Sequence, residues 1–171
     1  MVLKISLKSQ LYVLRELIII STVYFGFMFF LYIKVEFELF RILFLSTFLL
    51  YLLIFLLPVI ILHINYLNNN KYQNVIVEKN KLILNNILYN EIEQINIFAT
   101  HQHFNDSVGV SALPYNDYYY YLEICLKGGE KIILSSLFDY KIDEIFKKNF
   151  ESVKIIENPS SFGSLLIKSL L

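Results

Sequence analysis

The chain has 171 residues, of which 56% are hydrophobic and 18% are charged, with 15 Lys and Arg balancing 15 Asp and Glu. Soluble proteins carry roughly 25% charged residues, so this composition favours a membrane protein and excludes most soluble functions. Residues 1–71 hold six Lys and Arg against three Glu, a net charge of +3, whereas residues 72–171 hold nine Lys against twelve Asp and Glu, a net charge of −3. An acidic part without arginine is a poor binder of nucleic acid, so we expect no nucleic-acid partner.

Two uncharged apolar runs lie in the first third of the chain, at residues 17–33 and 42–62, over 17 and 21 positions. At ~1.5 Å per residue, helices of these lengths span about 25 and 31 Å, against a hydrocarbon core of about 30 Å. We therefore predict transmembrane helices at about 11–33 and 42–63, with residues 11–14 entering from the interface. A cleaved signal peptide is the less favoured alternative, because its apolar region is shorter and ends in a small-residue site such as Ala-x-Ala, which is absent here.

The two predicted spans form a transmembrane hairpin over residues 1–71, because only residues 34–41 connect them. Three basic residues precede the first span, three follow the second, and two lie in the connection, where two glutamates oppose them. This distribution favours cytoplasmic ends for both helices. It predicts a multi-pass protein of the cytoplasmic (inner) membrane with its soluble domain in the cytoplasm. Neither apolar run contains Asp, Glu, Lys, Arg or His, which argues against a transporter or pump.

Local features of the spans carry further expectations. Pro58 lacks a backbone N–H and is expected to kink the second span. Small and hydroxyl residues are expected to pack the two helices against each other, although they would also admit a neighbouring helix. These residues are Thr22, Gly26, Ser46 and Thr47. Tyrosines near both expected interfaces are typical of aromatic belts, and they are Tyr12, Tyr32 and Tyr66.

Residues 72–157 predict one small β-rich domain, because short runs rich in Ile, Val, Leu and Tyr alternate with turn signals. Lys79-Asn80 and Gly128-Gly129 indicate hairpin turns, and Tyr89-Asn90 indicates a turn before the third strand. The expected strands cover residues 75–77, 82–84, 92–99, 118–127, 131–137 and 153–157.

A helical period appears after the last predicted hairpin. Apolar residues recur at positions i, i+3, i+4 and i+8, which lie on one face of a helix. They are Ile142, Ile145, Phe146 and Phe150. Asp139 is the expected N-cap of this helix. The tail, residues 158–171, is expected either to form a short helix or to touch the membrane, and the sequence leaves both interpretations open.

The sequence contains few candidate catalytic or metal-binding residues. His101 and His103 form the only close histidine pair, beside Asp106, but a metal site needs three or four ligands in a defined frame, so a polar loop is the preferred interpretation. Cys125 lies in a predicted strand and is expected to be an inert core residue. Glu91 and Glu93 are expected on a solvated strand face. We therefore expect no catalytic residue, cofactor or metal site, and hence no enzyme.

A run of four tyrosines is the most distinctive feature of the polar part. Alternate residues on a strand point to opposite faces, so two of the four are expected to pack inward and two outward. An exposed row would offer a protein-interaction surface, whereas cross-strand pairing within the sheet is the alternative. The residues assigned to this surface are Tyr115, Tyr118, Tyr119, Tyr120 and Tyr121.

Residues 113–137 contain LPYNDYYY, followed after a short interval by LKGGEKIILSSL. They resemble the Pro-x-x-x-Tyr-x-Tyr segment and the strand pair that follows it in bacterial pleckstrin-homology-like (PH-like) domains. YNEIEQI at 89–95 is similar to the step into the third strand of that family. The two spans match the layout of bacterial membrane proteins with two transmembrane helices ahead of such a domain. Over roughly residues 74–157, the resemblance implies an α+β fold, a bent antiparallel sheet or partly open barrel with one helix. It also implies that Lys79 and Lys81 are what remains of the family's basic lipid pocket.

These observations lead to one preferred function and two alternatives. The preferred function is a membrane-anchored PH-like binding or scaffold module, which holds a protein partner or further copies of itself at the cytoplasmic membrane surface. The first alternative is a lipid or membrane-surface sensor that uses Lys79, Lys81 and the tail. A membrane enzyme or small transporter is the least favoured, because no ionisable groups converge on a site.

Overall fold

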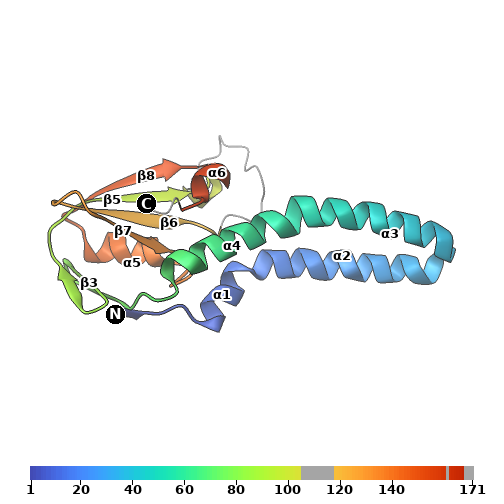
Figure 1. Ribbon diagram of the computed structural model, residues 1–171, viewed down its shortest axis with the longest axis horizontal. Coiled ribbons are helices and arrows are strands. Elements are labelled where there is room, and N and C mark those ends of the chain that lie inside the picture. Colours follow the sequence, from blue (N-terminus) through green and yellow to red (C-terminus); the bar gives the residue numbers. More distant parts are fainter. Residues whose placement is uncertain (105–117, 161, 168–171) are drawn as a thin grey trace.

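The computed structural model describes residues 1–104, 118–160 and 162–167. A long helical hairpin extends from one end of a β-rich head (Figure 1). In chain order the elements are β1 (Val2–Leu3), α1 (Leu7–Val13), α2 (Arg15–Lys34), α3 (Phe37–Tyr51), the π-helical turn η1 (Leu52–Leu56), α4 (Leu57–Asn70), β2 (Val75–Glu78), β3 (Lys81–Leu84), β4 (Ile87–Tyr89), β5 (Ile92–Ala99), the 3₁₀ turn η2 (Gln102–Phe104), β6 (Tyr121–Leu126), β7 (Lys131–Ser135), α5 (Ile142–Asn149), β8 (Lys154–Pro159) and α6 (Phe162–Leu165).

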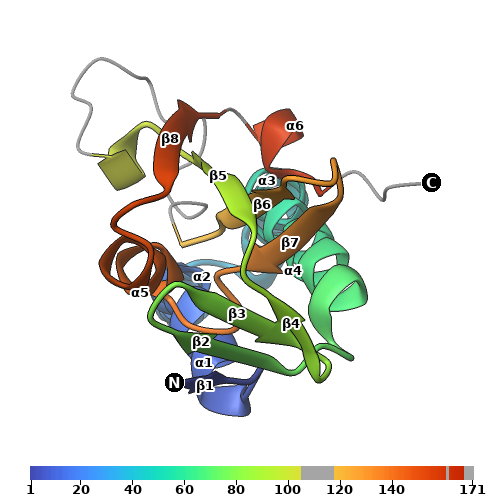
Figure 2. The same cartoon turned by 90° about the vertical axis from the view of Figure 1, so that its left-hand side faces the viewer.

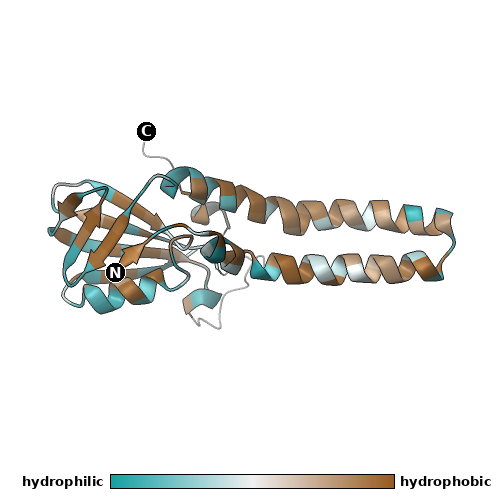
Figure 3. Cartoon of the chain, turned by 90° about the horizontal axis from the view of Figure 1, so that it is seen from below, coloured by the Kyte–Doolittle hydropathy of each residue, from teal (hydrophilic) through white to brown (hydrophobic). Residues whose placement is uncertain are grey.

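The hairpin consists of two helices that are long and apolar enough to cross a membrane, judged by length and composition alone. One is α2, with 20 residues, and the other runs without a break from α3 through η1 and α4, with 34 residues. Figure 3 shows apolar residues along most of both helices. The connection is tighter than the expected 34–41, because α2 ends at Lys34 and α3 begins at Phe37. Both helices therefore extend into the charged segment that was expected to form the loop.

The ends of the predicted spans need correction. Residues 11–13 were expected to begin the first span, but they belong to α1, a separate helix. The second span was expected to reach residue 63, but the head already covers its last residues. Val59 and Leu62 are fully buried against the head, and Leu17 is 8% exposed. The uncovered helices run from about residue 18 to 34 and from 37 to 57. They are roughly 26 and 31 Å long, close to the thickness of a hydrocarbon core.

Pro58 lies in the first turn of α4, directly after the π turn η1. A proline inside a regular α-helix removes one hydrogen bond and clashes with the carbonyl four residues before it. The wider π turn ahead of Pro58 accommodates this ring, since π turns insert one extra residue into a helix.

Hydroxyl and aromatic side chains join the two helices. Tyr24 stacks on Tyr51, with ring centroids 4.7 Å apart, and the Tyr24 hydroxyl lies 3.2 Å from Thr47 Oγ1. The Tyr51 hydroxyl lies 2.5 Å from Ser21 Oγ. The prediction that small and hydroxyl residues pack the hairpin is thus confirmed for Thr47. It is wrong for the other three, which are exposed on the outer faces of the helices: Thr22, Gly26 and Ser46.

The head contains two four-stranded sheets, in the orders β1-β2-β3-β4 and β7-β6-β5-β8, and they do not close into a barrel (Figure 2). The expectation of a wholly antiparallel sheet is wrong, because β8 pairs with β5 in parallel. Parallel strands cannot be joined by a tight turn. Helix α5 supplies the crossover that carries the chain from β7 at one edge to β8 at the other.

Five of the six expected strands are present near their predicted bounds, and the strand expected at 118–127 is shorter, as β6. Two strands were not expected. Strand β4 follows a two-residue turn in which Asn85 and Asn86 have φ of 50° and 70°, the positive values that a type I′ hairpin turn requires and asparagine tolerates. Strand β1 joins the sheet through Met1, whose carbonyl accepts from the Val77 N–H at 2.8 Å.

A single apolar core lies between the sheets and α5. The predicted amphipathic face is confirmed, because Ile142, Phe146 and Phe150 are at most 1% exposed and join this core. The predicted N-cap is displaced: Lys141 occupies the cap position, and its backbone N–H donates to Asp139 Oδ1 at 2.9 Å. The carboxylate therefore binds the backbone just before the first turn instead of within it.

Candidate functional site

A second apolar cluster joins the hairpin to the head. It combines buried residues of α1, α2 and α4 with residues of β6, the segment after β7 and the tail. The four-tyrosine run lies at this boundary, and each of its members contacts a different partner. We call the contacts of these four side chains the tyrosine junction.

Tyr118 contacts the start of α2. The Arg15 guanidinium lies over the Tyr118 ring, 4.1 Å from Cζ to the ring centroid, and Nη2 donates to the Tyr118 hydroxyl. Arg15 Nη1 donates to the Tyr12 hydroxyl at 2.7 Å, and the Tyr12 ring stacks on Tyr140 of the head at 3.9 Å. A guanidinium that stacks on rings and donates to hydroxyls is held in both position and orientation.

Tyr119 is fully buried and faces α4. Its hydroxyl lies 3.0 Å from His63 Nδ1, while His63 Nε2 lies 3.2 Å from Gln10 Oε1 of α1. The ring meets Tyr66 edge to face at 5.6 Å. Tyr119, two residues before β6, thus connects the head to two helices of the N-terminal part, α4 directly and α1 through His63. Burial raises the pKa of the Tyr119 hydroxyl, which therefore stays protonated as a hydrogen-bonding group.

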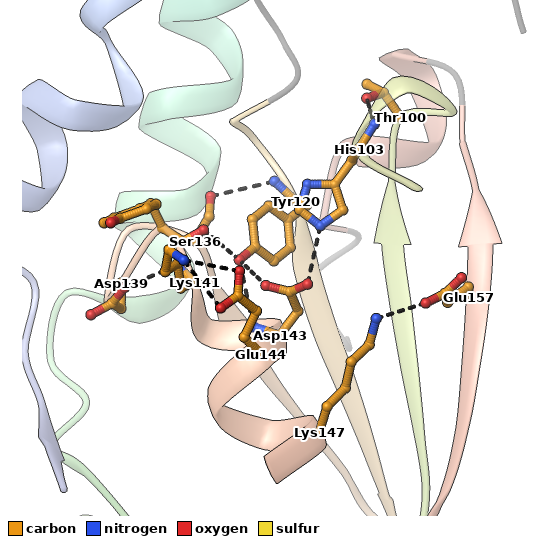
Figure 4. A network of polar contacts seen from close by, with 11 residues as sticks. Thr100, His103, Tyr120, Ser136, Asp139, Lys141, Asp143, Glu144, Lys147 and Glu157 are labelled. Atoms are coloured by element: carbon orange, nitrogen blue, oxygen red, sulfur yellow. Dashed lines mark hydrogen bonds and ion pairs between the residues drawn. The ribbon is translucent and has the colours of Figure 1, made fainter. Parts of the chain in front are cut away.

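Tyr120 faces the opposite side, towards α5 (Figure 4). Its hydroxyl lies 2.7 Å from Asp143 Oδ1 and 2.8 Å from the Tyr140 carbonyl. His103 Nε2 lies 3.3 Å from the other Asp143 oxygen, and the His103 ring lies 4.3 Å from the Tyr120 ring. Burial would raise the pKa of Asp143, but the hydrogen bonds from His103 and Tyr120 outweigh it and hold that pKa below its ordinary value. Burial and the Asp143 charge raise the pKa of Tyr120.

Tyr121 points again towards α4 and the tail. Its ring stacks on Phe98 at 4.8 Å, and its hydroxyl donates to the Ser164 carbonyl at 3.3 Å. Burial, followed by the Glu123 charge, raises the pKa of Tyr121 to about 12. The tail is also held by Asn65, which donates to the Ile167 carbonyl at 3.0 Å and accepts from its N–H at 2.8 Å. The described part of the tail therefore includes a short helix, α6, that contacts β5, followed by Ile167, which binds α4.

The predicted alternation of the tyrosines is confirmed, but the predicted exposed row is wrong. Tyr119, Tyr120 and Tyr121 are 0%, 1% and 8% exposed, and Tyr118 is half-buried. Both faces of the strand are covered, one by α4 and the other by α5, and for this reason neither face is left for a partner. Tyr115 lies outside the described residues.

Asn70, at the end of α4, closes part of the β7 edge. Its Nδ2 donates to the Ile133 carbonyl at 2.8 Å, and its Oδ1 accepts from the Ser135 N–H at 3.1 Å. The amide thus replaces one rung of a missing neighbouring strand. Among the described residues, two buried side-chain oxygens have no hydrogen-bond partner, and they are Tyr66 Oη and Ser135 Oγ. Tyr66 was expected at a membrane interface and lies instead in the shared core.

The residues with an expected lipid contact lie elsewhere. Lys79 is exposed in the β2–β3 turn and Lys81 is exposed at the start of β3. Figure 1 shows β3 at the end of the head remote from the hairpin. If the hairpin crosses a bilayer, this turn points away from it.

The remaining candidates are distributed over separate places. His103 binds Asp143 instead of forming a polar loop tip, while His101 has no part in that contact and Asp106 lies outside the described residues. Cys125 is half-buried beside Asn96 and not in the core. Burial and the neighbouring Glu123 raise the pKa of its thiol.

Glu91 and Glu93 are exposed, as predicted. Within residues 1–104, 118–160 and 162–167, no group of three or more His, Cys, Asp or Glu is placed to hold a metal ion.

Sequence reasoning missed His63 and Arg15 as residues of the tyrosine junction, and Asn70 as the residue that closes the β7 edge. Arg15 at the head of an apolar helix and a polar Asn-rich stretch at the end of another were visible signals, but their partners lie 103 and 63 residues away in the chain.

No protein-family model, curated protein or solved structure matches this chain.

Proposed function

We propose that this chain is a membrane-anchored, non-catalytic module whose PH-like head binds a protein partner, or a second copy of the chain, at the cytoplasmic membrane surface. The observation that carries this proposal is the tyrosine junction. Because two apolar helices and a β-rich head share one buried cluster, the hairpin holds the head at a set position instead of tethering it through a linker.

The apolar surface of the hairpin supports insertion in a bilayer. Large apolar side chains are exposed along α2 and α3, such as Phe29 at 66% and Ile42 at 63%. Soluble proteins rarely expose an apolar surface that continues along the length of two helices. Charged residues gather where the hairpin turns, including the Glu38–Arg41 ion pair with a 3.0 Å contact. A bilayer accounts for both features, because lipid solvates the apolar helices and water solvates the turn.

The PH-like assignment is supported by the two four-stranded sheets and the amphipathic helix after β7. It agrees with the resemblance of residues 113–137. Strands β1 and β8 extend beyond that pattern: one comes from the N-terminus, and the other follows the helix with which such domains normally end.

The free edge of β4 and the groove beside it provide the proposed contact surface. A groove of about 560 Å³ separates β3 and β4 from the start of β7, and its lining includes Leu84, Tyr89 and Ile132. Ile87 and Leu88 of β4 are 57% and 52% exposed. The two-residue turn makes Leu84 and Ile87 a hydrogen-bonded pair, so the N–H and C=O of Leu88 point away from β3. An extended segment of a partner can therefore add to β4 as a further strand.

The test uses the full chain in lipid nanodiscs with two variants of one residue. Leu88→Pro removes the outward N–H, which an edge strand tolerates, whereas Leu88→Ser removes the apolar side chain and keeps the N–H. We expect crosslinking and sedimentation to show association with a membrane protein or a second copy. That association should be lost in Leu88→Pro and retained, though weaker, in Leu88→Ser. A full chain that binds neither a partner nor itself would contradict the proposed function, and association that survives Leu88→Pro would contradict this edge as its site.

A further inference from the structure

Helix α1 carries an apolar face that the rest of the described chain leaves uncovered. Leu7 and Leu11 are 72% and 48% exposed. They are four residues apart and so lie on the same face of the helix. Leu14, one position after α1, packs instead against the second apolar cluster, whereas Ile18 at the start of α2 is 46% exposed. We call Leu7 and Leu11 the leucine face of α1.

The opposite side of α1 contacts the head. Tyr12 stacks on Tyr140 at 3.9 Å, and Val13 is 1% exposed in the shared cluster. Helical spacing places these two residues across the helix from Leu7 and Leu11. The leucine face therefore points away from the side of α1 that packs on the head. Figures 1 and 2 show α1 crosswise to the long axis of the hairpin.

The local sequence stabilises α1 in this orientation. Ser6 caps the helix, accepting from the Ser9 N–H at 3.1 Å, and Ser9 Oγ accepts from the Ser6 N–H at 3.0 Å. In the middle of α1, Gln10 Oε1 lies 3.2 Å from His63 Nε2 of α4. Because α1 has only seven residues, such a short helix would be marginal on its own. These contacts hold it where α2 begins.

The charges around α1 suit an anionic surface. Lys4 and Lys8 are exposed beside the leucine face, and no acidic residue precedes Glu16. A helix with apolar residues on one side and lysines at its flank lies in the plane of a membrane interface, with the apolar face about 5–10 Å below the head groups. Lysines at that level attract the phosphates of anionic lipids.

We propose that α1 is an interfacial helix, which inserts Leu7 and Leu11 among the upper acyl chains and holds anionic phospholipid head groups with Lys4 and Lys8. This inference rests on the same membrane placement of α2 and α3 as the proposed function. It assigns the lipid contact to the N-terminus, not to the β2–β3 turn, and it fixes the height of the head above the bilayer.

The depth of α1 is measured in the full chain, in nanodiscs that contain phosphatidylglycerol and phosphatidylcholine. In a Cys125→Ser background, single cysteines replace Leu7 or Leu11 and carry an environment-sensitive fluorophore. Matched labels replace Leu88, equally apolar and exposed but in the head, and Phe29, exposed in the middle of α2. Phospholipids carry a spin label at either an upper or a terminal position of the acyl chain, and each label quenches the fluorophore only at short range.

We expect strong quenching and a blue-shifted emission at positions 7 and 11 with the upper spin label and at position 29 with the terminal one, and no quenching by either label at position 88. If positions 7 and 11 behave like 88 while 29 is quenched, the interfacial role of α1 is refuted and the proposed function is untouched. If position 29 is not quenched either, the membrane placement fails, and both proposals fail with it.

The lysines are tested with the label at position 11. Replacing Lys4 and Lys8 by glutamine should reduce quenching about twofold in phosphatidylglycerol-containing discs and leave it unchanged in pure phosphatidylcholine, because only the anionic surface attracts them. The matched control replaces Lys79 and Lys81 and should have no effect in either lipid. Equal quenching in the Lys4/Lys8 variant and the unsubstituted chain would overturn the head-group contact.

Discussion

Replacing Asn70 by alanine tests how firmly the hairpin and the head are joined. Asn70 is 1% exposed, and its amide binds the Ile133 carbonyl and the Ser135 N–H on the edge of β7. Alanine removes both bonds, and also the 3.0 Å bond from Nδ2 to Gln73 Oε1, without adding a group that could replace them. Two backbone groups then lose their partners in a buried contact.

The expected loss of stability follows from those two groups. Each buried backbone group without a partner costs about 1–3 kcal/mol, which gives about 2–6 kcal/mol for both. Alanine recovers at most about 0.7 kcal/mol through its higher helix propensity, and less at a helix end. The free energy of unfolding of the head should therefore fall by about 2–5 kcal/mol.

The measurement is urea unfolding of the full chain in a mild non-ionic detergent, followed by near-ultraviolet circular dichroism. The chain has 13 tyrosines and no tryptophan, so this signal reports the packing of tyrosine rings, of which the junction holds several. With a slope of about 2 kcal/mol per molar urea, the midpoint should fall by about 1–2.5 M. The control is Asn68→Ala, an exposed position of the same helix. A midpoint for Asn70→Ala within about 0.3 M of that control would refute the closing of the β7 edge by this amide.

Three further outcomes are expected. Tyr120→Phe should cost about 1–3 kcal/mol, because Asp143 and the Tyr140 carbonyl lose the single O–H that lies between them. Tyr140→Phe, at a 37% exposed position, should cost little in the same urea assay. Since the fold lowers the pKa of Asp143, the contribution of this carboxylate to stability is present above the unfolded pKa near 3.8 and is lost as pH falls through the folded pKa. When the urea midpoint is plotted against pH, Asp143→Asn should therefore flatten the decline at acid pH. An unchanged decline would contradict this. The raised pKa of Cys125 should make its alkylation at neutral pH slower than that of a free thiol, and Glu123→Gln should accelerate it; equal rates for both proteins would exclude the glutamate as a cause.

Local patterns in the sequence were sufficient for most single elements. The period of two along residues 92–99 and the spacing of Ile142, Phe146 and Phe150 depend only on neighbours in the chain, and both elements are present. Strand β4 was also within reach, since Asn85-Asn86 between two apolar runs is a type I′ turn signal. Strand β1 was not, because two residues at the N-terminus show no period and pair only with β2.

The tyrosine run marks the boundary between what sequence and structure each decide. By itself, the sequence determined two apolar helices, a β-rich remainder and tyrosines that alternate in direction, because composition and period act through neighbouring residues. Only the tertiary structure decided that both faces of that run are covered, that Asn70 completes the edge of β7 and that β8 runs parallel to β5. Those outcomes depend on contacts between residues far apart in the chain, and a solvated tyrosine and a buried one have the same local pattern.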